Sequence, residues 1–276
     1  MPILHAVILG IVQGLSEFLP ISSSGHLLLV PWLFGWDDLE SASVKKAFDV
    51  ALHGGTLVAV VAYFRRDVAI YVREGVAVLR SRRRPTTPDG RLAWLLVLSS
   101  MPAAAAGALG ERYIDEQLGT PLLIGVSLVG FGLLLWWADR RPGERTLGDY
   151  RTGDALKVGA AQVLALNPGT SRSGITMTAA LLLGFQRDAA ARASFLMAIP
   201  VTAGAVVYKV GGLFIDGVPE GLAMPMLVGV VTSGIAGWTA VWGTLRLVRT
   251  RTFGWFVTYR VLLGAAVVGL VLTGIR

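Results

Sequence analysis

The chain has 276 residues, of which 54% are hydrophobic and only 16% are charged, and its mean hydropathy is positive. A soluble domain usually carries about a quarter charged residues, so this composition favours a protein that crosses a membrane several times. The net charge of +7 does not indicate nucleic-acid binding, because the basic residues lie in short loops between apolar runs. The absence of cysteine excludes disulfides, thiolate catalysis and cysteine-bound metals.

The first apolar segment, residues 3–34, contains a cluster of Pro, Ser and Gly in its middle, LPISSSGH. Its beginning, MPILHAVILG, lacks a basic region and a small-residue cleavage site, so we do not expect a removable signal peptide. Proline removes a backbone donor and disfavours helix in the residue before it, which predicts a break at the cluster. Each half is then too short to span a bilayer. The segment is therefore predicted to be a re-entrant helix hairpin.

Polar side chains lie on both sides of this break. Gln13 and Glu17 are four residues apart and share a helix face, and Ser22, Ser23 and Ser24 can cap the returning helix. His26 follows one turn after Ser23. A carboxylate, a hydroxyl and an imidazole that converge suit nucleophilic or general-base chemistry.

A structural interpretation of the same residues stays open. The serines would only cap the helix, His26 would donate one hydrogen bond, and Glu17 would face water. A carboxylate within a membrane segment is costly, which favours function for Glu17. Nearby, Gly10 and Gly14 form a pair that predicts close helix packing, and His53 in ALHGGT is interpreted as a hydrogen-bonded core histidine.

Six other apolar stretches are long enough to cross about 30 Å of hydrocarbon as helices. They cover residues 46–64, 92–110, 119–138, 190–209, 222–245 and 256–274. Three loops are rich in arginine: 65–91, 139–151 and 246–260. Two loops are acidic: 111–119 and 215–221. Arginine bias places the first group in the cytoplasm and the second outside, which puts both chain ends outside.

The last apolar segment, residues 155–184, contains LNPGTSRSGITM, in which Arg172 is surrounded by hydroxyls and glycines. We predict a second re-entrant hairpin, which enters from the cytoplasm and breaks at Pro168. A helix N-terminus after the break, the Arg172 guanidinium and the hydroxyls of Ser171, Ser173 and Thr176 together resemble a phosphate-binding cradle. The alternative is an arginine that extends to the cytoplasmic surface, with hydroxyls that pack helices.

The two hairpins are similar in sequence. Gly10, Gln13 and Leu15 match Gly159, Gln162 and Leu164 at a separation of 149, and Pro20 and Ser23 match Pro168 and Ser171 at a separation of 148. Each half, about 1–138 and 152–276, contains one hairpin and three spans. An odd number of spans inverts the second copy, and the site of such repeats usually lies at their interface. The expected fold is thus a single all-α membrane domain of residues 1–276, with six spans and two re-entrant hairpins in an inverted repeat.

At these clusters the chain resembles the bacterial integral-membrane undecaprenyl-pyrophosphate phosphatases linked to bacitracin resistance. Gln13 and Glu17 match the family's first motif, followed by Ser24, Gly25 and His26. The second motif is matched by Pro168, Gly169, Ser171, Arg172, Ser173 and Thr176. The resemblance runs along essentially the whole chain. It implies hydrolysis of undecaprenyl diphosphate to the monophosphate and inorganic phosphate, which recycles the lipid carrier of cell-wall synthesis at the outer face of the plasma membrane.

The resemblance also implies a divalent cation, Mg²⁺ or Ca²⁺, with Glu17 as a ligand. Where many members have a glutamate, this chain has Gln13, a poorer ligand, so a metal held by two carboxylates of the first motif is not expected.

In the mechanism expected from these residues, Arg172 binds the diphosphate together with backbone and hydroxyl donors. The predicted binding residues besides Arg172 are Gln13, Ser24, Gly169, Ser171, Ser173 and Thr176. Ser23, His26 or a water attacks, with Glu17 as the base or as a cation ligand. The rival hypothesis is a transporter or flippase that binds a phosphate-bearing lipid without cleaving it. The sequence leaves the number of subunits open, a homodimer included.

Overall fold

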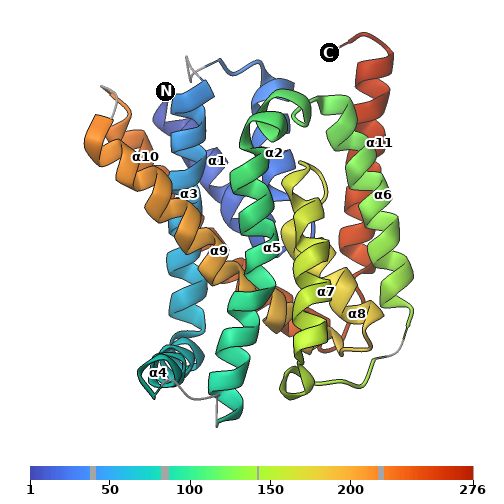
Figure 1. The fold of residues 1–276 in the computed structure, drawn as a ribbon. Coiled ribbons are helices and arrows are strands. Elements are labelled where there is room, and N and C mark those ends of the chain that lie inside the picture. Colours follow the sequence, from blue (N-terminus) through green and yellow to red (C-terminus); the bar gives the residue numbers. More distant parts are fainter. Residues whose placement is uncertain (38–41, 82–86, 142, 217–220, 276) are drawn as a thin grey trace.

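The computed structural model describes residues 1–37, 42–81, 87–141, 143–216 and 221–275, which are helical apart from turns. The helices are α1 (Ile3–Phe18), α2 (Ser23–Phe34), α3 (Ala42–Tyr63), α4 (Arg65–Ser81), α5 (Pro88–Gln117), α6 (Pro121–Asp139), η1 (Leu147–Asp149), α7 (Thr152–Val163), η2 (Leu164–Leu166), α8 (Arg172–Leu182), α9 (Arg187–Asp216), α10 (Ala223–Val248) and α11 (Gly254–Leu272). Figure 1 shows that most of the long helices run in roughly the same direction through one bundle.

Five of these helices are long and apolar enough to cross a membrane: α5, α6, α9, α10 and α11. A sixth span is obtained if α3 and α4 are counted as one bent pair. The all-helical, multi-pass architecture expected from composition is therefore confirmed, and each predicted span coincides with a helix. The prediction of a loop at 65–91 is wrong at both ends, because α4 occupies residues 65–81 and α5 begins at Pro88. The predicted loop at 111–119 is also mostly helical, because α5 extends to Gln117.

The bend between α3 and α4 amounts to 88°. Phe64 lies at this corner with its side chain buried, while Arg65 and Arg66 are exposed. In Figure 1, α4 consequently lies across one end of the bundle and does not continue along it. An amphipathic helix in this orientation is typical of a membrane–water interface.

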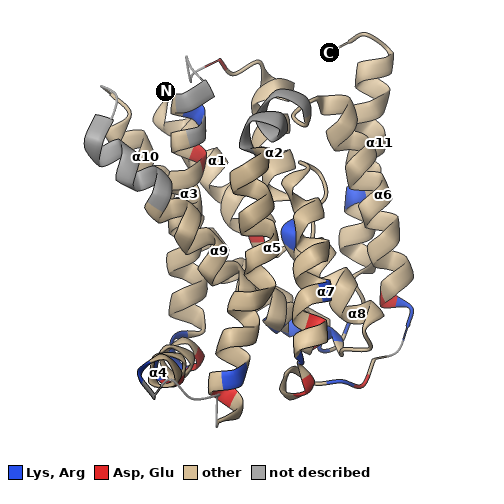
Figure 2. Cartoon of the chain, viewed as in Figure 1, with Lys and Arg blue, Asp and Glu red and all other residues tan. Residues whose placement is uncertain are grey.

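The charged residues and the chain ends divide the bundle into two ends. Figure 2 shows charged residues gathered at the end where α4 lies, with few along the middle of the bundle. Both termini lie at the opposite end (Figure 1). This arrangement agrees with the charge sorting of the loops, which placed the two termini on the side opposite the arginine-rich loops.

Two apolar segments are broken in the middle, as predicted. α1 and α2 are separated by residues 19–22, and α7 with η2 is separated from α8 by residues 167–171. Ser22 and Ser171 precede the two returning helices, and both adopt a positive φ, 79° and 74°, that non-glycine residues rarely take. Each serine hydroxyl accepts from the backbone N–H three residues later, at Gly25 and Gly174.

The shared conformation corrects the alignment of the two hairpins. Ser22 and Ser171 are equivalent, and so are Gly25 and Gly174, which restores the separation of 149 residues after the prolines. Arg172 therefore occupies the position that corresponds to Ser23, and the predicted pairing of Ser23 with Ser171 is wrong by one residue.

Glycines bring each broken segment against a helix from the other part of the chain. α1 packs on α10, where a Cβ on Gly10 would meet the Gly229 oxygen at 2.7 Å and one on Gly14 would meet the Ser233 oxygen at 2.5 Å. α7 packs on α5, where a Cβ on Gly159 would lie 2.6 Å from the Ser99 oxygen. The predicted role of Gly10 and Gly14 in close packing is confirmed.

The connection between α6 and α7 fixes the base of the second hairpin. Arg145 donates to both carboxylate oxygens of Asp154 at 3.0 and 2.5 Å and to the Leu183 oxygen at 2.9 Å. Its backbone pairs with Gly184 and Gln186 beside the end of α8. One bidentate arginine thereby joins the start of α7 to the end of α8.

Candidate active site

The breaks of the two hairpins meet inside the bundle. The N–H of Gly169 donates to the Ser22 hydroxyl at 3.0 Å, which joins the second break to the first. Gly169 has a φ of +93°, and a Cβ there would lie 2.6 Å from the Ile124 oxygen. Only glycine fits this position, because both the backbone conformation and the space exclude a side chain.

Arg260 of α11 forms hydrogen bonds with the backbone of both breaks. Its side chain is completely buried, and its Nη1 donates to the Pro20 oxygen at 3.0 Å. Nη2 donates to the oxygens of Gly169 and Thr170 at 2.9 and 3.0 Å, and Nε donates to the Leu128 oxygen at 3.2 Å. A guanidinium can satisfy several carbonyls in one plane, so Arg260 supplies the donors that the broken helices lack.

We expect Arg260→Met to destabilise the protein by at least about 3 kcal/mol, because buried carbonyls at both breaks lose their donors. Thermal unfolding in detergent measures this loss, and Arg260→Lys should lie between the variant and the parent because an ammonium has fewer donors. Arg251→Met, at an exposed residue before the same helix, is the matched control. Equal melting temperatures for Arg260→Met and Arg251→Met would contradict the assignment.

Glu17 lies at the end of α1 with its side chain only 4% exposed. Its Oε2 accepts from the Ser23 hydroxyl at 2.5 Å and from the Gln13 amide at 3.1 Å. The i, i+4 spacing of Gln13 and Glu17 and the turn at the break bring these groups together, as the spacing in the sequence predicted. A short hydrogen bond from a hydroxyl to a carboxylate is the geometry of a nucleophile beside its base.

Arg172, the first residue of α8, reaches Glu17 from the other hairpin. Its Nη2 donates to Glu17 Oε1, and its Nη1 donates to the Thr202 hydroxyl of α9 at 2.9 Å. The side chain of Arg172 remains 20% exposed. The guanidinium is therefore partly accessible and belongs to the first residue of a helix, where the helix dipole adds partial positive charge, and this favours the binding of an anion.

His53 of α3 also faces Glu17, contrary to its interpretation as a core histidine. Its Nε2 lies 3.5 Å from Glu17 Oε2, and its side chain is 28% exposed. Its Nδ1 lies 2.7 Å from the Asp49 oxygen, and because a carbonyl can only accept, Nδ1 carries a hydrogen. The ring is thus fixed with Nε2 toward the site.

We expect His53→Leu to lower kcat/KM for phosphate release about tenfold, because Glu17 loses one of its partners. His53→Gln should retain most of the activity, since an amide N–H can donate to Glu17 as the Nε2–H of the protonated ring does. Initial rates of both purified variants check this. If the two variants lose activity equally, the imidazole contributes something other than this contact.

Both ring nitrogens of His26 have hydrogen-bond partners, and neither partner is the Glu17 carboxylate. Nδ1 contacts the Ser22 oxygen and Nε2 contacts the Tyr259 hydroxyl, each at 2.7 Å. The rings of His26 and Tyr259 are stacked. In this arrangement His26 supports the first break and α11.

The other predicted binding residues divide into two groups. Ser24 is exposed, and its hydroxyl lies 3.5 Å from that of Ser22. Ser171 and Ser173 contact each other, and Ser173 donates to the Leu19 oxygen at 3.0 Å. Thr176 donates to the Arg172 oxygen at 2.8 Å, and its hydroxyl also bonds Ser194 of α9. The last three side chains are buried and stabilise the hairpins in this structure.

A divalent cation would have few protein ligands here. Among the described residues, no three acidic, histidine or cysteine side chains form a metal-binding group. Glu17 offers its carboxylate. The Gln13 amide, which donates to Glu17, also has a buried oxygen, Oε1, that finds no hydrogen-bond partner in the part of the chain that the structure describes. One carboxylate and one amide oxygen fit a Mg²⁺ ion that keeps waters and is bound mainly by substrate phosphates.

The sequence is similar to known proteins along its whole length. A family model described as bacitracin resistance protein BacA matches residues 6–266. A protein from Pelobacter propionicus named undecaprenyl-diphosphatase is 47% identical over 277 residues, covering 100% of this chain and 99% of the relative. A protein of the same name from Geobacter sulfurreducens is 48% identical over 269 residues, covering 97% of each, and one from Moorella thermoacetica is 45% identical over 98% of each. With hairpins, polar residues and family model in agreement, the chain belongs to the bacitracin resistance protein BacA family.

Proposed function

We infer that this protein is an undecaprenyl-diphosphatase, a membrane hydrolase that releases inorganic phosphate from undecaprenyl diphosphate. Its similarity to enzymes of that name supports this function. The observation that carries it is the contact of Ser23 and Arg172 with the same carboxylate, Glu17, where the two hairpins meet. A hydroxyl beside a base and a guanidinium at a helix N-terminus are the groups that phosphoryl transfer requires.

Ser23 is the nucleophile in our proposal. Its hydroxyl oxygen attacks the terminal phosphorus, its proton passes to Glu17, and the bond to the bridging oxygen breaks. The undecaprenyl phosphate that leaves takes this proton from Glu17, which restores the carboxylate. Water, deprotonated by Glu17, then attacks the phosphorus of the phosphoserine. The bond from phosphorus to the Ser23 oxygen breaks, inorganic phosphate leaves, and Glu17 returns the proton to Ser23. The 2.5 Å contact between Ser23 and Glu17 favours Ser23 over His26, whose two nitrogens are already bound.

Arg172 binds the terminal phosphate and stabilises its charge during transfer. To do so, its Nη2 must exchange the Glu17 oxygen for a phosphate oxygen, while Nη1 stays on Thr202. A divalent cation on the diphosphate, bound by Glu17 and Gln13 Oε1, would neutralise further charge.

We propose that the two broken segments are re-entrant hairpins of an inverted repeat, with the α4 end of the bundle in the cytoplasm. The matched turns at Ser22 and Ser171 and the arginine-rich loops at one end support this orientation. The site would then open to the outer face of the bacterial plasma membrane, where it recycles the carrier lipid of cell-wall synthesis. The isoprenyl tail would lie in lipid between helices.

Purified protein in detergent should release inorganic phosphate from undecaprenyl diphosphate. Because detergent leaves no second compartment, release there distinguishes hydrolysis from transport. A chelator added to the same assay should lower the rate if a cation on the diphosphate takes part. Binding of the lipid without release of phosphate would refute the hydrolase and favour a carrier, and an unchanged rate with the chelator would refute the cation.

A further inference from the structure

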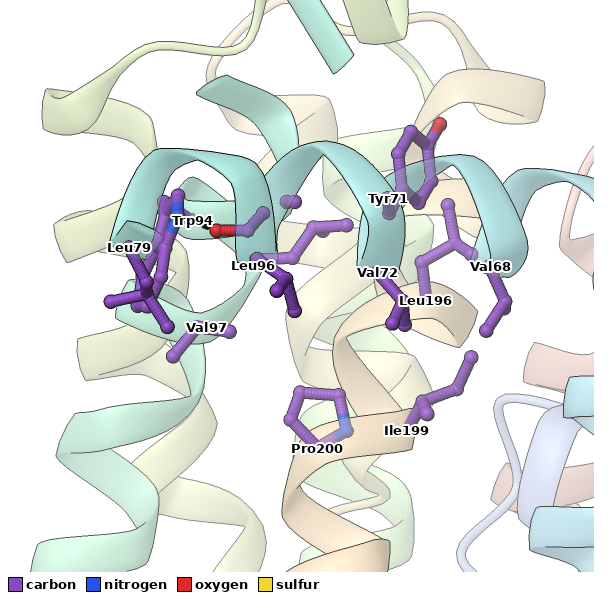
Figure 3. Close-up of a pocket in the computed structure, with 13 residues that line it drawn as sticks. Val68, Tyr71, Val72, Leu79, Trp94, Leu96, Val97, Leu196, Ile199 and Pro200 are labelled. Carbon is purple, nitrogen blue, oxygen red and sulfur yellow. Dashed lines mark hydrogen bonds between the residues drawn. The ribbon is translucent and has the colours of Figure 1, made fainter. Parts of the chain in front are cut away.

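A groove about 310 Å³ in volume, here called the α4 groove, lies between α4, α5 and α9. In Figure 3, Val72 extends from α4 toward Pro200 and Ile199 of α9, while Leu79 lies beside Trp94 and Val97 of α5. The lining is almost entirely apolar. A volume of this size is at the lower end of the range, about 300–1,000 Å³, that small-molecule sites occupy.

On its α5 side, the α4 groove is bounded by direct contacts between α4 and α5. The Trp94 indole N–H of α5 donates to the Gly75 oxygen of α4 at 3.3 Å. Gly75 lies against Ala93, where a Cβ would be 3.6 Å from the alanine side chain. On its α4 side the groove is open, since its lining residues Val72 and Leu79 are 59% and 60% exposed. Apolar side chains exposed beside membrane spans face hydrocarbon chains.

Arginines border the same groove. A second hollow on α4 is lined by Val72, Arg73, Val76, Ala77 and Arg80, so it shares Val72 and Val76 with the α4 groove. The Arg73 side chain is 75% exposed, and its contact with Glu74 at 3.1 Å lies on the surface, where ion pairs contribute little. An apolar cleft thus opens directly beside two cations. This combination is complementary to a molecule with an apolar chain and an anionic head.

We propose that the α4 groove binds an anionic phospholipid, with one acyl chain between α4, α5 and α9 and the phosphate between Arg73 and Arg80. The site shares no residue with the Glu17–Arg172 site and does not depend on the proposed hydrolysis. The isoprenyl chain of the substrate is the other apolar occupant to consider. It would explain the apolar lining, but its diphosphate binds Arg172 in the proposed function, which would leave Arg73 and Arg80 without a role.

Native mass spectrometry of the full-length protein, titrated with phosphatidylglycerol or phosphatidylcholine of matched chains, tests the site. We expect phosphatidylglycerol to bind at several-fold lower concentration. Arg73→Gln with Arg80→Gln should abolish this preference, because the attraction of even one basic residue to an anionic membrane surface is worth about fivefold. The matched control is Arg140→Gln with Arg246→Gln, two arginines that lie over tryptophan rings elsewhere.

A second pair of variants tests the apolar part. Val97→Trp should fill the α4 groove and weaken binding of both lipids, whereas Val126→Trp, at an exposed residue of α6, should not. All these variants should release phosphate at the parent's rate. Equal binding of the two lipids to the parent, an unchanged preference after loss of Arg73 and Arg80, or displacement of the bound lipid by undecaprenyl phosphate would overturn the proposal.

Discussion

Arg172→Ala is expected to reduce kcat/KM for phosphate release by about three orders of magnitude, the effect of an arginine that stabilises a transferring phosphoryl group. This substitution removes the guanidinium that would bind the phosphate at the start of α8. It also leaves the buried Glu17 carboxylate without its guanidinium partner. Arg172→Lys should recover little, because a point charge cannot donate to Thr202 and to phosphate in the same plane. Initial rates with purified variants measure both effects.

The matched control is Arg246→Ala, at an exposed arginine over the Trp242 ring, which should leave the rate unchanged. Melting temperature must be measured alongside, since Arg172 also joins the hairpins. If Arg172→Ala is folded and retains more than about a tenth of the parent's kcat/KM, the guanidinium does not stabilise the transferring phosphate.

Ser23→Ala should be equally damaging, with a loss of about three orders of magnitude or more, because Ser23 is the hydroxyl that donates to the proposed base, Glu17. Acid-quenched reactions of the parent should contain phosphoserine in the peptide that includes Ser23, and this signal should be absent from the variant. His26→Gln is the comparison, and we expect it to lose far less activity and to retain the phosphoserine. Substantial turnover by Ser23→Ala would instead indicate that water attacks directly.

The positions of the spans could be predicted because bilayer thickness fixes the length of an apolar helix. By contrast, α4 was not predicted as a helix. Its arginines suggested a loop, although Val68, Val72, Val76 and Leu79 recur at helical spacing and mark an apolar face. Charge density alone does not distinguish a basic loop from an interfacial helix, whereas periodicity does.

The sequence alignment of the two hairpins is wrong by one residue after the break because it pairs Pro20 with Pro168. In the structure the equivalent residues are the serines that cap α2 and α8. The second hairpin has one residue more between its proline and its cap. Capping is a local constraint, so Ser22 and Ser171 could have been aligned through the glycines three residues later.

The site could be predicted where its contacts are local. Gln13, Glu17 and Ser23 are neighbours around one break, and helix geometry places them together. His26 and Tyr259 are 233 residues apart in the sequence, so their contact could not be predicted from a local pattern. Arg260 did leave a signal, because it is a charged residue within the predicted span 256–274, and such residues seldom face lipid.

The contact between Glu17 and Arg172 also bears on how turnover ends. Once orthophosphate has formed, the neighbouring carboxylate competes with it for the same guanidinium, and it does so as a tethered ligand at high effective concentration. Glu17 is therefore an internal anion that can displace orthophosphate from Arg172. Product inhibition by orthophosphate should consequently be weak, even though the same arginine binds the esterified diphosphate during the reaction.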